Sequence, residues 1–219
     1  MTVEKDNDPR LDACLVCLVV AEGCTTGSTP PALAAALEEL AGRRKVDGFP
    51  PPAVKEAVRD MLRPGGYKPA GRQKPASEYL AQAAREERFP SINAPVDCNN
   101  LLSLETGLPI SLLDAKAVGS TALVRICGQG ESYVFNASGH EMDLSGLLCV
   151  CSPDGTPLGN PIKDSMAAKL KEDSADYAGL IYAPASLYDA KSLAAVGERF
   201  AALLLEHCGA RTASVQTVA

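Results

Sequence analysis

Residues 93–109 read NAPVDCNNLLSLETGLP, and they are the most informative stretch of the chain. The segment from Pro90 to Pro95 is expected to form a turn. It is followed by Val96 to Thr106, which predicts a helix that ends at Gly107. This helix is mostly apolar but carries a dense group of polar side chains. What that group faces is therefore the first question that the sequence raises.

The polar group consists of Asp97, Asn99, Asn100, Ser103 and Glu105. Ser103 is four residues from Asn99 and three from Asn100, so on a helix their amide and hydroxyl groups can point to a single spot. An alternative is that these side chains serve the helix itself, with Asp97 as its N-cap. Periodicity does not separate the two interpretations.

The hydrophobic pattern around this helix predicts one compact α/β unit. Leu11 to Ala21 is apolar and β-branched, which is typical of a buried strand. Further helices are expected over residues 32–41, 50–62, 77–88 and 192–207, and short strands over 122–127, 132–136, 147–151 and 180–182. The expected organisation is a polar tail over residues 1–10, a single domain over 11–209 and a second tail over 210–219.

Composition fits a globular protein with an aliphatic core. The chain has 219 residues, of which 46% are hydrophobic and 5% aromatic, and it contains no Trp. No apolar run approaches the ~20 residues that span a bilayer, and residues 1–10 lack the pattern of a signal peptide. A cytoplasmic protein that does not enter a membrane is therefore expected.

Common catalytic and metal-binding patterns are missing. The chain has eight Cys but only two His, and Cys14 and Cys17 would point to opposite faces of a strand. We expect reduced core thiols and no metal. His140 and His207 have no evident Ser or Cys partner, and no Gly-rich phosphate loop is present, so no cofactor is expected.

Charge is unevenly distributed along the chain. The formal net charge is -6, which argues against DNA or indiscriminate nucleic-acid binding, yet residues 41–90 hold 11 basic and six acidic residues. This stretch can present a surface to phosphates, or it can consist of ordinary solvated helix faces.

The polar helix and its surroundings resemble the B3/B4 domain, the editing module of the phenylalanyl-tRNA synthetase β subunit, which also occurs as an isolated bacterial protein. The resemblance rests on Lys74-Pro-Ala-Ser-Glu-Tyr-Leu80 and on residues 89–109, and continues through Leu113-Asp114, Arg125, Gly130-Glu131 and Glu172-Asp173-Ser174. It covers roughly residues 67–185. It implies a mixed α+β fold, with a central mixed sheet flanked by helices and a cleft that hydrolyses the ester of mischarged tRNA.

The resemblance also implies roles for individual residues. Asn99 and Asn100 match the polar pair of the family's helix and are expected to line the amino-acid pocket or to position water. Ser111 stands where the synthetase module has His, and Tyr182 where it has Glu, so rejection of tyrosine does not carry over. The expected catalytic residues are Asn99, Asn100 and Ser111. The expected substrate-binding residues are Asp97, Ser103, Glu105, Gly159, Asn160, Lys163, Asp164, Ser165 and Tyr182, and the expected tRNA-binding residues are Arg43, Arg44, Lys45, Lys68, Arg72 and Lys74.

Three functions are consistent with these features. The first is a trans-acting deacylase that hydrolyses mischarged aminoacyl-tRNA, a chemistry that needs no triad because the ester is already activated. The second is a module of the same fold that binds tRNA, RNA or an amino acid without catalysis. The third is an interaction protein that forms a homodimer through apolar helix faces.

Overall fold

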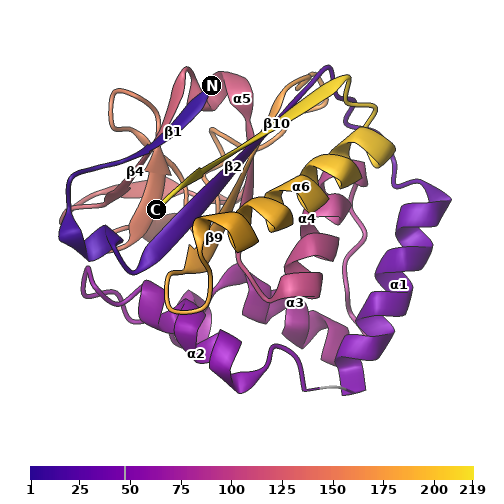
Figure 1. Cartoon of the computed structure of the whole chain (residues 1–219), viewed down its shortest axis with the longest axis horizontal. Coiled ribbons are helices and arrows are strands. Elements are labelled where there is room, and N and C mark those ends of the chain that lie inside the picture. Colours follow the sequence, from indigo (N-terminus) through magenta and orange to yellow (C-terminus); the bar gives the residue numbers. More distant parts are fainter. Residues whose placement is uncertain (47) are drawn as a thin grey trace.

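Two four-stranded sheets lie side by side in the computed structural model, and helices α1 to α4 gather next to them (Figure 1). The structure describes residues 1–46 and 48–219. The strands are β1 (Thr2–Lys5), β2 (Cys14–Glu22), β3 (Ile110–Asp114), β4 (Thr121–Ile126), β5 (Ser132–Val134), β6 (Glu141–Asp143), β7 (Leu148–Cys151), β8 (Pro157–Gly159), β9 (Tyr177–Pro184) and β10 (Thr212–Val218). The helices are α1 (Pro31–Val46), α2 (Pro52–Met61), α3 (Ala76–Arg85), α4 (Ala94–Thr106), α5 (Ala115–Val118) and α6 (Ala190–His207), with 3-10 turns η1 (Pro9–Leu11) and η2 (Gly71–Gln73).

The first sheet has the order β10-β2-β9-β3, and all its strands are antiparallel. Every residue of β9 is buried, as expected for a central strand that is covered on both faces. Helix α6 packs against β2 and β10. Gly197 makes this close approach possible, since a Cβ there would lie 2.5 Å from Cys17 Sγ and 2.7 Å from Val215 Cγ1.

The second sheet has the order β1-β4-β7-β8, with β1 parallel to β4 and the other pairs antiparallel. Strands β5 and β6 form a separate two-stranded hairpin. The predicted mixed α+β class is confirmed, with the strands divided between these sheets. All eight cysteines are free and buried. They include the five in apolar strand-like runs that the sequence predicted to be reduced core thiols, namely Cys14, Cys17, Cys127, Cys149 and Cys151.

The two ends of the chain correct the prediction of polar tails. Strand β1 pairs with β4 from Thr2 to Lys5, and β10 pairs with β2 from Thr212 to Val218. Both are edge strands, and exposed residues recur along each of them. An edge strand needs few apolar residues because backbone hydrogen bonds hold it on one side only. Because both segments contain few apolar residues, their hydrophobic pattern did not predict strands.

Helix α4 matches the predicted helix and begins two residues earlier. Its N-cap is Asn93, whose side chain accepts a hydrogen bond from the Val96 N–H at 3.1 Å. It ends at Gly107, which has a φ of 80°, a left-handed conformation that favours glycine. The helix contacts α1, α3, α6 and β3. These contacts place its polar residues beside the start of β3.

Candidate active site

Two hollows open on the face of α4 that carries the asparagines. The first, called here the Asn100 hollow, has a volume of about 350 Å³ and is lined by Asn99, Asn100, Ser103, Arg72, Tyr79 and Lys163, among others. The second, the Asp164 hollow, has a volume of about 380 Å³ and is lined by Ile92, Val96, Leu112, Asp164, Lys169 and Leu170, among others. Asn99 borders both hollows. The predicted convergence of Asn99, Asn100 and Ser103 is therefore present around one space.

The side-chain amides of Asn99 and Asn100 lie beside these hollows. Within the part of the chain that the structure describes, Asn99 Oδ1 is buried and has no hydrogen-bond partner. Buried polar atoms are normally paired, so an unpaired one beside a cavity favours a water or ligand donor at that place. Asn100 is 6% exposed and borders the Asn100 hollow. Each amide can offer two N–H donors and one acceptor oxygen to a ligand.

Asp97 is fully buried and does not cap the helix. Its carboxylate accepts hydrogen bonds from Thr29 Oγ1 at 2.6 Å, Ser91 Oγ at 2.7 Å and the Ile92 N–H at 3.0 Å. The alternative in which Asp97 caps the helix does not hold, because these donors occupy its carboxylate and Asn93 is the cap. Asp97 was expected to bind substrate, but it lines neither hollow. Asp97 instead fixes the segment that leads into α4.

A buried chain of hydroxyl groups holds Asp164. Ser111 Oγ donates to Asp164 Oδ1 at 2.6 Å, and Tyr182 OH lies 3.0 Å from Ser111 Oγ. Because serine has a single hydroxyl proton, Tyr182 acts as the donor to Ser111. Ser111 and Tyr182 lie on the paired strands β3 and β9 and have no exposed surface, so only Asp164 reaches the hollow.

Burial raises the pKa of Asp164 to about 6, against the lowering effects of the Ser111 hydrogen bond and the charge of Lys169. Burial and the nearby Asp164 carboxyl also raise the pKa of Tyr182. Tyr182 is therefore neutral and available as a donor. Asp164 is ionised at neutral pH, in surroundings where an added positive charge is favourable.

The end of β8 and the loop after it support the site from behind, since neither Gly159 nor Asn160 lines the Asn100 hollow or the Asp164 hollow. Gly159 leaves room for the Asp164–Ser111 pair, since a Cβ there would lie 2.7 Å from Asp164 Oδ1 and 3.1 Å from Ser111 Oγ. Asn160 Oδ1 accepts from the Ile162 and Lys163 N–H groups at 2.8 and 3.0 Å. Asn160 therefore organises the turn rather than facing a ligand.

The remaining predicted substrate residues have different surroundings. Ser103 borders the Asn100 hollow but donates to the Leu108 carbonyl at 2.7 Å. Ser165 is buried and accepts from the Ala167 N–H at 3.2 Å. Glu105 forms an ion pair with Arg199 of α6, with 2.9 Å between Glu105 Oε1 and Arg199 Nη2, and lines neither hollow. Lys163 lies with Nζ 4.0 Å from the centre of the Phe135 ring.

The six predicted tRNA-binding residues fall into two groups. Lys68, Arg72 and Lys74 lie around η2, where Arg72 is exposed and borders the Asn100 hollow. Arg43, Arg44 and Lys45 lie at the end of α1. Arg44 donates to the carbonyls of Leu104 and Glu105, and Lys45 forms an ion pair with Glu87.

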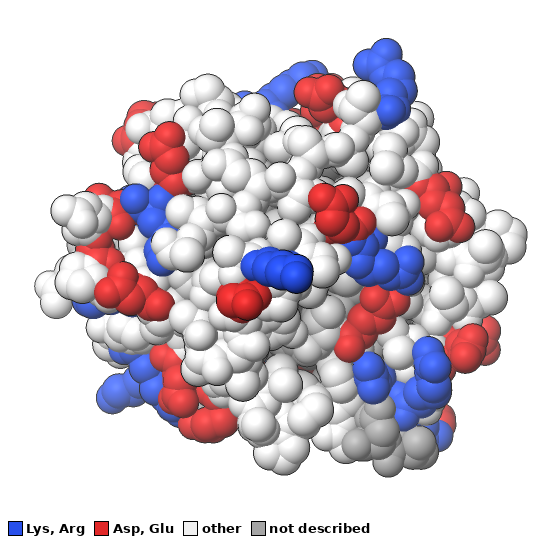
Figure 2. Space-filling view, in the orientation of Figure 1, with Lys and Arg blue, Asp and Glu red and all other residues white. Residues whose placement is uncertain are grey.

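The basic stretch as a whole is largely matched by its own acids. Arg59 binds the buried Glu78, and Arg63 pairs with Glu56 and Asp60. On the face shown in Figure 2, Lys and Arg side chains are interspersed with Asp and Glu. The cations around η2 are therefore better placed for a ligand of the Asn100 hollow than the stretch as a whole.

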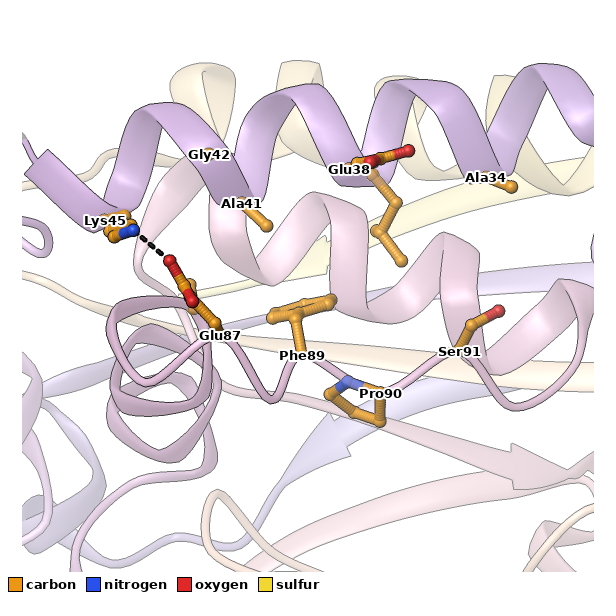
Figure 3. Close-up of a pocket in the computed structure, with 11 residues that line it drawn as sticks. Ala34, Glu38, Ala41, Gly42, Lys45, Glu87, Phe89, Pro90 and Ser91 are labelled. Atoms are coloured by element: carbon orange, nitrogen blue, oxygen red, sulfur yellow. Dashed lines mark hydrogen bonds and ion pairs between the residues drawn. The ribbon is translucent and has the colours of Figure 1, made fainter.

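A third, larger hollow of about 540 Å³ lies between α1 and the segment after α3 (Figure 3). Phe89 and Pro90 face the Ala34 and Ala41 side of α1, and the ion pair of Lys45 and Glu87 closes one end. Its lining is mainly apolar and lacks a convergent set of hydrogen-bonding groups. This groove was not predicted from the sequence. The small residues of α1 are the signal that could have indicated it.

Two residues at the candidate site were also missed. Lys169 borders the Asp164 hollow and donates to the Phe135 carbonyl at 2.8 Å, and Tyr79 borders the Asn100 hollow. Neither carries a local signal, because each reaches the site only through the fold.

Within residues 1–46 and 48–219, no group of three or more His, Cys, Asp or Glu side chains is arranged to hold a metal ion. None of the helices described is both long and apolar enough to cross a bilayer.

Comparison with models of known protein families finds no match. Comparison with curated proteins finds none either. Among solved structures, the chain is similar to an N-terminal fragment of the phenylalanyl-tRNA synthetase β subunit from Pyrococcus horikoshii, with 11% sequence identity and a TM-score of 0.44. The match covers 98% of this chain and 50% of that one, so the chain spans about half the length of the fragment.

Proposed function

We propose that this chain is a B3/B4-type editing protein that hydrolyses the ester of mischarged aminoacyl-tRNA. The observation that carries the proposal is the position of the two asparagines. The buried Oδ1 of Asn99 has no hydrogen-bond partner among the described residues, Asn99 borders both hollows, and Asn100 borders the first. The Asn100 hollow offers an aromatic ring and cations at its edge, which suit a terminal nucleotide with its phosphates. The ester linkage would then lie beside Asn99.

In the proposed reaction, a water molecule adds to the ester carbonyl carbon. The bond from that carbon to the ribose oxygen breaks, the ribose oxygen regains a proton, and the amino acid leaves as a carboxylate with release of one proton to solvent. Asn99 Oδ1 accepts a hydrogen from the attacking water, and the N–H groups of Asn100 stabilise the negative charge that develops on the carbonyl oxygen. Ser111 and Tyr182 act behind Asp164 as positioning residues, because neither reaches a hollow.

The test is deacylation of a panel of mischarged tRNAs by the purified chain. Asn100→Ala is expected to lower the rate by about 10² to 10³, the effect of losing one oxyanion donor, and Asn99→Ala to lower it similarly. Asn7→Ala, in an exposed loop, is the matched control and should retain the rate. Failure of every charged tRNA to be cleaved, or equal cleavage by all three variants, would contradict the proposal.

A second candidate is a binding module of the same fold. It is favoured by the burial of Ser111 and Tyr182, which stand where the synthetase module has His and Glu, because neither borders the Asn100 hollow or the Asp164 hollow. This candidate predicts tRNA binding that weakens with salt but no ester cleavage. Arg72→Gln should reduce the slope of the logarithm of tRNA affinity against the logarithm of salt concentration by about one released ion. Arg63→Gln should not change this slope, because Glu56 and Asp60 already pair with Arg63.

A further inference from the structure

We propose that the Asp164 hollow receives an aliphatic amino-acid group whose α-ammonium binds the Asp164 carboxylate. This inference rests on the proposed function, since it assigns the second hollow to the amino acid when the first holds the terminal adenosine. It goes further by naming the class of amino acid.

The shape and lining of the hollow favour a branched aliphatic side chain. Val96 enters from α4, Leu112 from β3, and Leu170 from the loop before β9. Among the described residues that line this hollow, none is aromatic and none presents a free hydroxyl. An aliphatic group removes apolar surface from water here, whereas a phenol would leave its hydroxyl without a partner.

The charge in the hollow favours an ammonium group. Asp164 accepts from Ser111 through Oδ1, and the backbone of Asn160 and Leu112 also stabilises its charged form. A carboxylate has about four lone-pair sites and can accept a further hydrogen bond. Burial still makes its ionisation costly, and a bound cation would offset that cost. Lys169 acts on Asp164 through its charge, but its Nζ donates to the Phe135 carbonyl, and among the described residues it forms no direct ion pair with Asp164.

The position of Asn99 connects the two halves of the ligand. It borders both hollows, so a group that spans from one to the other must pass its side chain. The carbonyl of an aminoacyl linkage is such a group. A free amino acid has the same ammonium and side chain but would place a carboxylate beside Asn99.

The experiment measures binding by calorimetry with adenosines that carry an amide-linked acyl group on a 3′-amino substituent, which cannot be hydrolysed. The probes are the valyl form, the isovaleryl form, which differs only in lacking the ammonium, the tyrosyl form, and free L-valine. The valyl form is expected to bind about tenfold more tightly than the isovaleryl form, the gain from one charge-assisted contact. It should also bind more tightly than the tyrosyl form, whose phenol hydroxyl would lack a partner. Free valine should bind more weakly than the valyl form, because it lacks the adenosine.

Two variants and one control test the contact. Asp164→Asn should reduce the valyl affinity to that of the isovaleryl form and leave the isovaleryl affinity unchanged. Leu170→Phe, which narrows the hollow from a loop, should weaken the valyl form and retain adenosine binding. Asp12→Asn alters an exposed carboxylate that borders neither hollow and should change nothing.

The outcomes separate this inference from the proposed function. Equal binding of the valyl and isovaleryl forms, tighter binding of the tyrosyl form, or equal loss of both forms in Asp164→Asn would overturn the inference. If these probes still bound and lost affinity in Asn100→Ala, the proposed function would stand. If none of the probes bound, both would fail. Tighter binding of free valine than of the valyl form would assign the hollow to the free amino acid and also overturn the inference.

Discussion

Gly159 is the residue on which the geometry of the site depends most directly. It has no side chain at the one place where the Asp164 carboxylate and the Ser111 hydroxyl meet the backbone of β8. Any larger residue must displace one of those two groups. The site is therefore sensitive to a change that adds a single methyl group.

We predict that Gly159→Ala disrupts the site. The added Cβ would lie 2.7 Å from Asp164 Oδ1, and such overpacking costs about 1–3 kcal/mol of stability. Ligand affinity or deacylation should fall by about tenfold or more, because Asp164 can no longer hold its position. Urea unfolding and the activity assay measure the two effects. Gly42→Ala, on α1 with no atom within 4 Å of the added Cβ, is the control and should be neutral or slightly stabilising. An active Gly159→Ala variant would show that Asp164 need not stay where it is.

Some residues of the site could be predicted from the sequence, and others could not. Asn99, Asn100 and Ser103 were found because helical spacing alone brings them together. Asp164 was expected at the site from the family resemblance. Its hydrogen-bonded connection to Ser111 and Tyr182 depends on β3 and β9 being neighbours. No local pattern contains that pairing. Whether Asp97 served as a cap or faced a ligand could not be decided from the sequence, because one of its three donors is the distant Thr29.

Helix α4 is held at both ends by groups from other elements. Asp97 fixes its first turn to residues 91 and 92, and Arg44 of α1 binds its last carbonyls. Arg44 Nε lies 3.0 Å from the Leu104 oxygen, and its guanidinium lies 4.1 Å from the centre of the Phe49 ring. A cation at this end also interacts favourably with the helix dipole.

We predict that Arg44→Ala lowers the free energy of unfolding by about 1–3 kcal/mol, because buried carbonyls lose a charged donor. Its neighbour Arg43 is largely exposed, with Glu39 as a distant partner at 3.9 Å, so Arg43→Ala should change stability by less than about 0.5 kcal/mol. Chemical denaturation of both variants provides the measurement. Equal stability of the Arg44→Ala and Arg43→Ala variants would mean that Arg44 does not anchor α4. Arg44 would then again be a candidate for phosphate binding.

Element prediction succeeded for the helices and for the strands expected over residues 122–127, 132–136, 147–151 and 180–182, which appear as β4, β5, β7 and β9. It failed for strands that show no alternation or lie at a sheet edge. The helices of residues 77–88, 96–106 and 192–207 appear as α3, α4 and α6 with shifts of a few residues. Strand β3 was missed because Ile110–Asp114 is short and buried throughout, so it has no alternation to detect. Strands β1 and β10 were missed for the opposite reason, since their edge positions require little hydrophobicity.

At the scale of the whole molecule, the site imposes a cost on stability that depends on pH. The pKa of Asp164 is raised to about 6 in the folded protein, from 3.8 for an unperturbed carboxyl. The folded state therefore holds this proton more tightly than the unfolded state. Stability from this group is greatest below about pH 4 and is lost as the pH rises through about 6. Glu131 behaves in the opposite way, because its hydrogen bond with Arg125 lowers its pKa to about 2, so its contribution is lost as the pH falls below about 4.5.

We predict that Asp164→Asn gains stability relative to the natural chain as the pH rises from about 4 to about 6. Urea unfolding of both proteins between pH 4 and pH 8 should give a difference that grows by about 1–2 kcal/mol between pH 4 and pH 6 and is flat from pH 6 to pH 8. Glu131→Gln is the control with opposite sign, since its stability deficit should be full above pH 5 and shrink on acidification. Lys169, Tyr133 and Tyr182 also face Asp164, but the two tyrosines have raised pKa values and stay neutral throughout this window. A difference that does not vary with pH would mean that Asp164 is as well solvated as in the unfolded chain, and the hollow would then have no need of a cationic ligand.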